Sequence, residues 1–588
     1  MPIIVQKFGG TSVADSQKIL AAARKAIRTQ KDGNQVVMVV SAMGKQTDFL
    51  VDLAAQITER PAAREMDMLL STGEQVSVAL MAMAIHSLGH KAVSLTGAQI
   101  GIKTDSTHTK ARINSISTDR MQGLLNEGNV VIAAGFQGID DDFNITTLGR
   151  GGSDTTAVAL AAVLRAECEI YTDVDGVYTT DPRVVAEARR MSQVSYDEML
   201  ELASLGAGVM HSRAVEFAKK FDVPIHVRSS FSDTPGTMVV ADPESKNTAV
   251  SGAAVTKDEA RVTIADVPDV PGTSFEIFSR IADCKVTVDM IVQNVGAEGK
   301  ADISFTVPSD ELEVTLEAVD AAIKKLGGGE VTHDGNVSKV SVVGLGMADQ
   351  TGVADRMFRS LAESDINIQM ITTSEIKISA LVEREAALPA LRTVHQAFNL
   401  DQPPENLSTS ETTSSPADAI DVVESLQGAS MEELTIDDVS LDSTQARVTI
   451  AGVPNAPGIA ARVFEDIAAA GIFVDMIVQS YGTGELANLS FTVPRDLLDK
   501  ASGVAKQLSE KLNCKSVTRS PEVAKLSVSG IGLRSHTGVA IRMFKALTDA
   551  GINMEMINTS EVRVNVVVDG KVGDDALQAL LAAFADVV

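Results

Sequence analysis

The second half of the chain repeats itself, and this repeat limits the possible folds more than any other feature. Residues 261–272 align with residues 447–458 at an offset of 186, with nine of twelve positions identical. The segment DMIVQ at residues 289–293 recurs unchanged at residues 475–479. A repeat this long predicts a duplicated structural unit rather than a single continuous core.

A shorter offset of 80 residues divides each copy again. Gly272 and Phe278 match Gly352 and Phe358 at this offset, and the second copy shows the same relation. Each of the four modules has the predicted order strand, helix, strand, strand, helix, strand, which is typical of a ferredoxin-like βαββαβ sandwich. A period near 80 is too long for a standard solenoid, so we expect small globular modules that pair through their sheets.

The first 245 residues have a different pattern. Predicted strands and helices alternate there, which indicates an α/β domain: an αβα sandwich with a central, mostly parallel sheet. We therefore expect a domain at 1–245, a module pair at 246–400, a linker at 401–440 and a second pair at 441–588. Residues 401–445 contain eleven acidic residues and no Lys or Arg, so this linker should be solvated and flexible.

Composition excludes several classes of protein. The net charge of −27, with no Trp and four Tyr, argues against nucleic acid or an anionic membrane as a partner. No stretch of 18 apolar residues and no secretion signal is visible. The three cysteines lack metal-ligand spacing. We expect a cytoplasmic protein with no membrane partner and no metal held by protein side chains alone.

The segment KFGGTSV at residues 7–13 lies between a predicted buried strand at 3–5 and a predicted helix at 14–27. Two glycines at a strand-to-helix turn let the backbone approach a ligand, and a helix N-terminus favours an anion. Lys7 adds a positive charge at the end of the strand. The segment therefore predicts a phosphate cradle without P-loop spacing. A tight turn with an exposed lysine is the alternative.

Other polar residues follow predicted strands or begin predicted helices. A second Gly-rich turn at 149–154 contains Arg150, and Ser153 or Asp154 could cap the helix that follows. In open parallel sheets, ligands lie beyond the carboxyl ends of the strands. Arg150 could hold a carboxylate bidentately, and Glu74 could hold an ammonium group. A small amino acid together with a nucleoside triphosphate fits this set.

No Ser-His-Asp or Cys-His arrangement can be placed. His86, His90 and His108 are expected on the surface, and His211 is expected to cap a helix. A carboxylate acceptor needs no general base, because it is already ionised at pH 7. Catalysis would then depend on positioning and on charge neutralisation by Lys7, Mg²⁺ and backbone amides.

Three segments together resemble the signatures of the aspartate kinase family: KFGGTSV at 7–13, GRGGSD at 149–154 and TDVDGVY at 172–178. The modules resemble ACT domains, and the whole arrangement is similar to the four-ACT aspartate kinases of some bacteria, including cyanobacteria. The resemblance implies an amino-acid kinase fold at 1–245. It also implies MgATP-dependent phosphorylation of the L-aspartate side chain to 4-phospho-L-aspartate, which begins lysine, threonine and methionine biosynthesis. A homodimer or higher homo-oligomer is expected.

The resemblance also assigns roles to residues. Lys7 and Asp154 would be catalytic. Contacts to aspartate or along the phosphoryl path are implied for Ser41, Thr47, Glu74, Arg150, Gly151, Gly152 and Ser153. Contacts to ATP are implied for Lys7, Phe8, Gly9, Gly10, Thr172, Asp173, Tyr178, Asp181 and Arg183, with Mg²⁺ held mainly by the phosphates. The chain departs from the family at Gly208, where a lysine that contacts nucleotide is usual. For Asp175, a simple turn is the alternative.

For the ACT modules, the resemblance implies amino-acid effectors bound between paired modules. The implied residues are Asp269, Gly272, Ser274 and Gln293 in the first pair, and Asn455, Gly458, Ala460 and Gln479 in the second, with Asn367 and Asn553 contributed by the partner modules. Asn455 replaces the charged Asp269, so the two sites should differ in affinity or ligand. We expect concerted feedback inhibition by lysine and threonine.

Two alternatives remain. One is a related kinase for another acceptor, such as acetylglutamate, glutamate, carbamate or UMP, which the spelling of residues 7–13 disfavours. The other is a non-catalytic amino-acid sensor, which the intact Lys7, Arg150 and Asp154 disfavour. A fused homoserine dehydrogenase is not expected, because no dinucleotide-binding domain follows residue 400.

Overall fold

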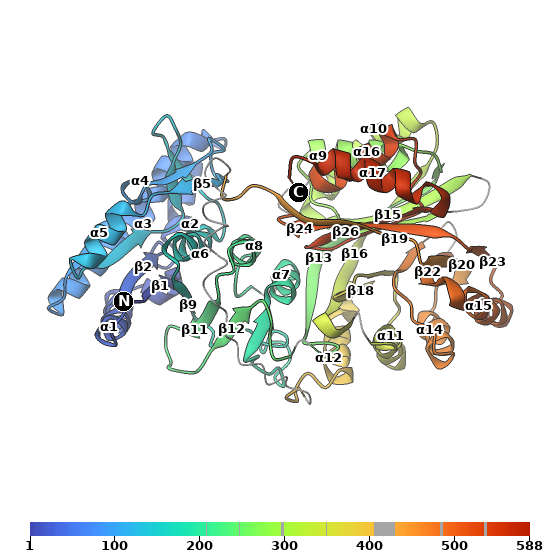
Figure 1. Cartoon of the computed structure of the whole chain (residues 1–588), viewed down its shortest axis with the longest axis horizontal. Helices are drawn as coiled ribbons and strands as arrows, with labels where there is room; N and C mark the ends of the chain where they lie inside the picture. Colours follow the sequence, from blue (N-terminus) through green and yellow to red (C-terminus); the bar gives the residue numbers. More distant parts are fainter. Residues whose placement is uncertain are drawn as a thin grey trace.

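The computed structural model describes the whole chain except residues 207, 246, 296–298, 348–349, 405–429, 482–485, 534–537 and 588. An amino-terminal domain and a carboxy-terminal part of four modules lie beside each other (Figure 1). Most of the expected linker, residues 405–429, is outside the described residues.

The amino-terminal domain is built on an eight-stranded sheet in the order β10-β12-β11-β9-β1-β2-β6-β3. All neighbouring strands in it are parallel except β11 and β12. Its strands are β1 (Ile3–Phe8), β2 (Gln35–Val40), β3 (Ala92–Leu95), β6 (Val130–Ala134), β9 (Glu167–Thr172), β10 (Gln193–Ser195), β11 (Ile225–Ser229) and β12 (Thr237–Val240). The expected mostly parallel sheet is confirmed.

Helices cover both faces of this sheet. They are α1 (Ser16–Lys31), α2 (Gln46–Ile57), α3 (Ala63–Ser87), α4 (Gly97–Ile100), α5 (Asp119–Asn126), α6 (Gly152–Leu164), α7 (Tyr196–Ser204) and α8 (Ser212–Lys220). Strand β2 shows why both faces are apolar. Val36, Met38 and Val40 belong to the core cluster that includes α1 and α3, whereas Val37 and Val39 belong to the cluster that includes α6 and α8. Side chains that alternate along β2 thus pack into two cores, one on each face of the sheet.

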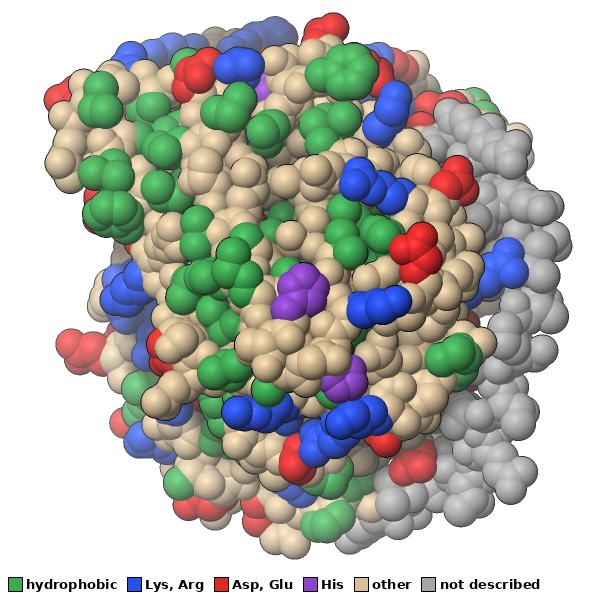
Figure 2. Space-filling view, turned by 90° about the vertical axis from the view of Figure 1, so that its left-hand side faces the viewer, with side chains coloured by type: hydrophobic (Ala, Val, Ile, Leu, Met, Phe, Trp, Pro, Cys, Tyr) green, Lys and Arg blue, Asp and Glu red, His purple; other side chains and the backbone are tan. Residues whose placement is uncertain are grey.

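A small sheet in the order β5-β4-β7-β8 completes this domain, with β4 (Ile102–Thr104), β5 (Ile113–Ile116), β7 (Gln137–Ile139) and β8 (Ile145–Thr147). Among the described residues, α3 is the one helix long and apolar enough to cross a membrane, and half of its apolar window is buried within the protein. Its exposed positions include Val76, Leu80 and Met83. Figure 2 shows the end of the molecule formed by this domain, where hydrophobic side chains gather between Lys and Arg. The expected homo-oligomer stays a prediction.

The carboxy-terminal part contains four βαββαβ modules, as expected. Modules 1 and 2 are built from β13 (Gly252–Pro268), α9 (Thr273–Asp283), β14 (Asp289–Val295), β15 (Lys300–Pro308), α10 (Leu312–Leu326), β16 (Glu330–Val343), α11 (Val353–Glu363), β17 (Met370–Thr373), β18 (Lys377–Glu383) and α12 (Ala387–Ala397). Modules 3 and 4 are built from β19 (Thr435–Asp442), β20 (Gln445–Pro454), α14 (Ile459–Ala469), β21 (Ile477–Tyr481), β22 (Leu486–Pro494), α15 (Leu498–Leu512), β23 (Ser516–Ser520), β24 (Val523–Ile531), α16 (Gly538–Asp549), β25 (Met556–Thr559), β26 (Arg563–Asp569) and α17 (Gly573–Phe584).

The modules are nested rather than strictly consecutive. The first residues of β13, 252–256, pair with residues 339–343 of β16 and so belong to module 2, while the rest of β13 belongs to module 1. In the second copy, β19 pairs with β24 and so belongs to module 4, although module 3 follows it in the chain. Strand β19 lies partly inside the expected linker at 401–440, which is therefore shorter at its carboxyl end than the composition suggested.

The modules also associate differently from the expected consecutive pairs. Strand β17 of module 2 pairs with β21 of module 3, and β14 of module 1 lies beside β25 of module 4. Helices α9, α10, α16 and α17 form one layer, and α11, α12, α14 and α15 form another on the opposite side of the sheets (Figure 1). Each interface therefore joins one module from each copy of the duplication. A sequence period identifies related modules, but it does not say which of them meet.

The end of the expected linker binds the amino-terminal domain. Glu432 accepts hydrogen bonds from Arg213 at 2.6 Å through both carboxylate oxygens and from the Ile113 amide at 2.8 Å. Met431 is buried in the core of that domain, and Lys220 donates to the carbonyl of Glu433 at 2.8 Å. Residues 430–433 are thus an anchored segment, which the acidic composition did not suggest.

Candidate active site

Lys7 and Asp154 form the centre of the site. Lys7 lies near the carboxyl end of β1, between Val39 of β2 and Ile170 of β9. Its Nζ is 2.5 Å from Oδ1 of Asp154, in the first turn of α6, and both side chains are nearly buried. Low exposure strengthens this ion pair, because little water screens it. The structure therefore brings together the two predicted catalytic residues from positions 147 residues apart in the chain.

The glycine turn after β1 packs tightly. A Cβ atom at Gly10 would lie 2.8 Å from the carbonyl oxygen of Ala42, so any side chain there would collide with the neighbouring loop. A Cβ atom at Gly9 would lie 3.5 Å from Nζ of Lys7, which places this backbone beside the ammonium group. Phe8, just before the turn, stacks on Tyr171 with ring centroids 4.7 Å apart.

The helix after this turn begins later than expected. Residues Gly10–Val13 form a 3₁₀ turn, and α1 starts at Ser16 rather than at residue 14. The side chain of Asp15 caps α1 by accepting a hydrogen bond from the Lys18 amide at 2.9 Å. An acidic cap already satisfies that helix N-terminus. The backbone available to an anion is therefore that of the glycine turn.

Glu74 lies on α3 in an almost fully buried position. Its Oε1 accepts a hydrogen bond from the Ala42 amide at 3.1 Å, while Oε2 is buried without a hydrogen-bond partner among the described residues. Burial raises the pKa of this carboxyl group to about 7. A buried oxygen with spare capacity is suited to accept a hydrogen bond from a ligand, such as an ammonium group.

The second glycine turn differs from expectation in one detail. Gly151, with φ of 74°, occupies the N-cap position of α6, so neither Ser153 nor Asp154 caps the helix. Asp154 is engaged with Lys7 instead. A Cβ atom at Gly151 would lie 2.3 Å from Cβ of His211, which shows how closely these segments approach. Arg150 is exposed and makes no ion pair with the described residues, so its guanidinium is available to a ligand.

His211 is the N-cap of α8, as predicted, and its Nδ1 accepts a hydrogen bond from the Arg213 amide at 3.4 Å. Burial lowers the pKa of His211, which favours the neutral ring that this role needs. His108, expected on the surface, is partly exposed but also contacts a buried carboxylate. Its Nδ1 is 2.7 Å from a carboxylate oxygen of Asp67, a fully buried residue of α3 that also holds Thr147 and the Thr109 amide.

Asp67 was missed because one acidic residue in an apolar helix is no signal by itself. The loop that it holds supports the second glycine turn: a Cβ atom at Gly149 would lie 3.0 Å from the carbonyl oxygen of Thr109. The buried carboxylate therefore stabilises the base of the turn that contains Arg150.

The other residues assigned to ATP begin at Thr172, the last residue of β9, and continue into the loop after it; β9 lies next to β1. Thr172 donates a hydrogen bond to Asp173 at 3.2 Å. Tyr178 donates to Asp175 at 2.8 Å, so Asp175 is part of a local turn network. Farther along, Arg183 pairs with Asp181 at 2.8 Å in an exposed position, and this hydrogen bonding lowers the pKa of Asp181.

The remaining predicted residues flank the glycine turn after β1. Ser41 follows β2, and its amide donates to the carbonyl of Phe8 at 3.1 Å. Thr47 lies in the first turn of α2, close to Gly44, whose amide donates to Gly10 at 3.0 Å. Gly208 has φ of 45°, a left-handed conformation that favours glycine over the lysine usual in the family.

The residues assigned to effectors lie at the two module interfaces. Asn553 of module 4 donates a hydrogen bond to Asp269 of module 1 at 2.7 Å, and Asn367 of module 2 donates to Asn455 of module 3 at 2.8 Å. Gly272 and Gly458 have φ of 99° and 81° and are the N-caps of α9 and α14.

Both conserved glutamines of the repeat cross these interfaces. Gln293 donates to the carbonyl of Met554, and Gln479 donates to the carbonyl of Ile368. Ser274 donates to Gln293 at 2.6 Å, but its counterpart Ala460 cannot do so. The two sites therefore differ at two positions. Between modules 2 and 3, the cavity at Asn367 and Asn455 has a volume of only about 10 Å³.

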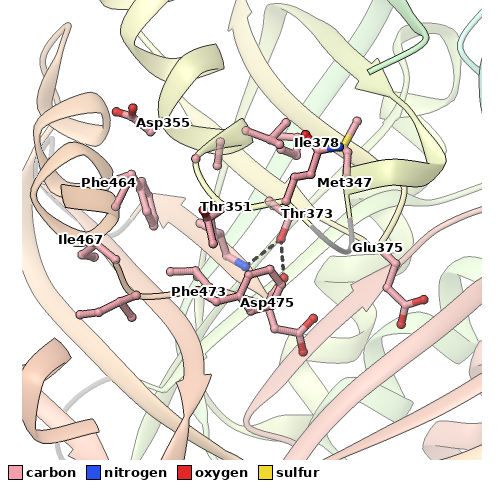
Figure 3. Close-up of a pocket in the computed structure, with 18 of the residues that line it drawn as sticks. Met347, Thr351, Asp355, Thr373, Glu375, Ile378, Phe464, Ile467, Phe473 and Asp475 are labelled. Carbon is pink, nitrogen blue, oxygen red and sulfur yellow. Dashed lines mark hydrogen bonds between the residues drawn. The ribbon is translucent and has the colours of Figure 1, made fainter. Parts of the chain in front are cut away.

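A larger cavity between modules 2 and 3 is lined by other residues than Asn367 and Asn455, and we call it the 2–3 cavity (Figure 3). Its volume is about 310 Å³. Carboxylates of Asp355, Glu375 and Asp475 line it together with Phe464 and Ile467 (Figure 3). Oδ1 of Asp355 is buried without a hydrogen-bond partner among the described residues. The cavity was not predicted, although its Ser374-Glu375 segment recurs as Ser560-Glu561 and offered a signal.

The corresponding space between modules 1 and 4, the 1–4 cavity, is smaller, with a volume of about 90 Å³. Asp289, Ser560 and Glu561 line it together with Phe278 and Phe544. The two cavities are related by the 186-residue offset of the repeat.

Comparisons with known proteins agree with this architecture. The sequence profile of the amino acid kinase family matches residues 2–229, and the ACT domain profile matches residues 340–398, 448–507 and 526–584. Aspartate kinase of Stutzerimonas stutzeri is 52% identical over 409 residues, which cover 69% of this chain and 99% of that protein.

Two solved structures extend the comparison. Aspartate kinase from Synechocystis is 42% identical with a TM-score of 0.52, covering 99% of this chain and 98% of that one. Escherichia coli aspartokinase III, solved with aspartate and ADP, is 25% identical with a TM-score of 0.57, covering 67% of this chain and 99% of that one. With the Lys7–Asp154 pair beside a glycine turn and four ACT modules after it, the chain belongs to the aspartate kinase family.

Proposed function

We propose that this enzyme transfers the γ-phosphoryl group of ATP to the side-chain carboxylate of L-aspartate and releases 4-phospho-L-aspartate and ADP. The nearly buried Lys7–Asp154 pair supports this proposal most strongly, because it places one oriented cation beside bare backbone amides at the carboxyl edge of the sheet. A cation and amides in this position stabilise charge that develops on a transferring phosphoryl group.

The acceptor needs no general base. An oxygen of the aspartate β-carboxylate, ionised at pH 7, forms a bond to the γ-phosphorus. The bond from that phosphorus to the bridging oxygen breaks, and its electron pair leaves with ADP. Exposed Arg150 would hold the α-carboxylate, and Oε2 of Glu74 would accept a hydrogen bond from the α-ammonium group. These contacts fix the acceptor in line with the phosphoryl group.

The nucleotide would lie along the loop after β9, near Thr172, Asp173 and Tyr178. Mg²⁺ would be held mainly by the nucleotide phosphates. When bound, Mg²⁺ would neutralise phosphate charge.

We further propose that the ACT modules inhibit the enzyme when lysine and threonine bind, so that end products of the pathway control its first step. The two interfaces differ at Asp269/Asn455 and Ser274/Ala460, which favours two different ligands. The 2–3 cavity has features that suit lysine. Four carboxylates line it, and although Lys525 pairs with Asp475 and Arg563 with Glu375, Oδ1 of Asp355 could accept a hydrogen bond from an ammonium group. Phe464 and Ile467 suit the aliphatic chain.

The test is a hydroxamate assay for acyl phosphate with aspartate and MgATP, with and without lysine plus threonine. We expect acyl phosphate from aspartate and a lower rate with both amino acids at low aspartate. No acyl phosphate from aspartate would refute the catalytic proposal, and a panel of acetylglutamate, glutamate, carbamate and UMP would then identify another acceptor. Absence of ATP turnover with every acceptor would favour a non-catalytic sensor. An unchanged rate with both amino acids would refute the regulatory proposal alone.

A further inference from the structure

Helix α7 of the amino-terminal domain presents two fully buried carboxylates to the regulatory modules. Glu198 accepts hydrogen bonds from the Ser251 hydroxyl at 2.7 Å and from the Leu345 amide at 3.3 Å. One turn later, Glu201 forms a 2.7 Å ion pair with Lys377 and accepts a hydrogen bond from the Glu561 amide at 3.1 Å. Glu201 therefore contacts module 2 and module 4 at the same time.

The partners of these carboxylates belong to segments that line the two cavities. Leu345 is two residues from Met347, and Lys377 is two residues from Glu375; both Met347 and Glu375 line the 2–3 cavity (Figure 3). On the other side, Glu561 itself lines the 1–4 cavity. A ligand that displaces either segment must therefore move or break a contact of Glu201.

The repeat shows that this arrangement is asymmetric. Glu375 and Lys377 correspond to Glu561 and Arg563 at the 186-residue offset. Arg563 forms an ion pair with Glu375, so the two segments hold each other across the approximate symmetry. The amino-terminal domain adds a third carboxylate, Glu201, at Lys377 only. Glu201 thus contacts a module of each interface at the same time.

The other end of α7 leads to the substrate turn. After α7 the chain reaches His211, which caps α8 and packs directly against Gly151. Gly151 follows Arg150, the residue proposed to bind the aspartate carboxylate. The hydroxyl of Thr256 also donates to the Leu205 carbonyl at 3.2 Å, which ties the end of α7 to the carboxy-terminal part. A shift of α7 would therefore be transmitted to the turn that contains Arg150.

We propose that Glu201 is a positioning residue that couples both effector cavities to the substrate turn through α7. This inference rests on the proposed regulation by amino acids and goes beyond it, because it names the connection. Residues 374–377 or 560–563 can take two arrangements, each coupled to a position of α7. An effector that binds one arrangement better than the other shifts the equilibrium between them by the difference in its binding free energies. Occupation of both cavities acts on the same carboxylate, which explains how two ligands act together.

The test uses the full chain with the E201Q/K377M double variant. Replacing both partners removes the Glu201–Lys377 pair without leaving either of these two charges alone. Lys377 also faces the carboxylates of Asp289 and Glu561, so E201D, which keeps the lysine, is the second variant. We expect lysine and threonine to bind with dissociation constants within about threefold of wild type by calorimetry, while the ratio of rates without and with effectors falls from about 10 or more toward 1. The control is D197N, on the same helix, whose carboxylate pairs with Lys219 of its own domain at 2.8 Å and should keep full inhibition.

Two outcomes would overturn this inference: full inhibition in the double variant, or a loss of effector binding that accompanies its loss of inhibition. If the double variant does not fold, E201D keeps both charges but shortens the carboxylate's reach; it should bind effectors normally and be inhibited less, and full inhibition would again refute the inference. A wild-type enzyme that makes acyl phosphate but neither binds nor responds to amino acids would remove the proposed regulation itself, and this inference with it.

Discussion

Asn553 donates a hydrogen bond to Asp269 at 2.7 Å across 284 residues of sequence. The contact joins the last module to the first, just as Asn367 joins the two middle modules through Asn455. A single chain thus builds two interfaces that each need both copies of the duplication.

We expect the two interfaces to bind ligands with different affinities. Substitution of Asp269 by asparagine, the residue type of its counterpart Asn455, tests whether this charge difference is the cause. In D269N the first site loses the charge that its counterpart Asn455 also lacks. We expect the amino acid that binds between modules 1 and 4 to bind about 10 to 100 times more weakly, since a charge-assisted hydrogen bond is replaced by a neutral one. Calorimetry measures the dissociation constant. The reciprocal N455D variant should strengthen binding between modules 2 and 3, and unchanged affinity in both variants would contradict the assignment.

Lys7 should dominate the chemical step. In K7M, we expect kcat to fall by about 10²- to 10³-fold, because the variant lacks the cation that Asp154 holds beside the glycine turn. The hydroxamate assay gives the rate, and thermal unfolding shows whether the fold persists. K103M is the matched control, since Lys103 pairs with Asp141 on the surface and should be dispensable. A K7M enzyme with wild-type kcat would refute the catalytic role.

The raised pKa of Glu74 predicts that it makes the free energy of unfolding depend on pH, and that the E74Q variant lacks this contribution. Burial raises its pKa from 4.5 to about 7 in the folded enzyme, so folding favours the protonated form. The stabilisation from this group is therefore fully present below pH 4.5 and is lost as the pH rises through 7, a loss of about 3 kcal/mol. Without ligand, the stability of E74Q relative to wild type should rise by this amount between pH 4.5 and 8.

Denaturant unfolding at several pH values measures that difference, and a constant difference would contradict the shifted pKa. Aspartate adds a second expectation. Its ammonium group interacts best with ionised Glu74, so the KM for aspartate should fall as the pH rises through 7 in wild type. In E74Q this dependence should be weaker.

Much of the fold was predictable because local patterns and global structure agree. The apolar runs of β1 and β2 are buried on both faces, as a parallel sheet requires. Gly10 occupies a turn with no room for a Cβ atom. The pairing of Lys7 with Asp154 was implied only by resemblance to a family, because no local pattern connects residues from two distant turns.

Other features depend on tertiary contacts that no short segment encodes. Asp154 was a candidate helix cap by propensity, but the nearby Lys7 competes for its carboxylate. The period of the repeat identified four modules, yet β13 and β19 each precede one module and complete another. The role of Glu201 required the three-dimensional contact between α7 and two modules, since a single acidic residue in an amphipathic helix has no distinctive pattern.

The anchored segment at 430–433 gives the last prediction. Glu432 and Arg213 are both largely buried, and each carboxylate oxygen of Glu432 accepts a bond from Arg213. In E432A the guanidinium loses its only described ion-pair partner, which should destabilise the junction by about 3 kcal/mol. Denaturant unfolding and hydrogen exchange at residues 111–114 should show earlier opening there. E433A is the control, because it keeps the backbone carbonyl of Glu433 to which Lys220 donates. Equal stability of the two variants would mean that Glu432 does not anchor this segment.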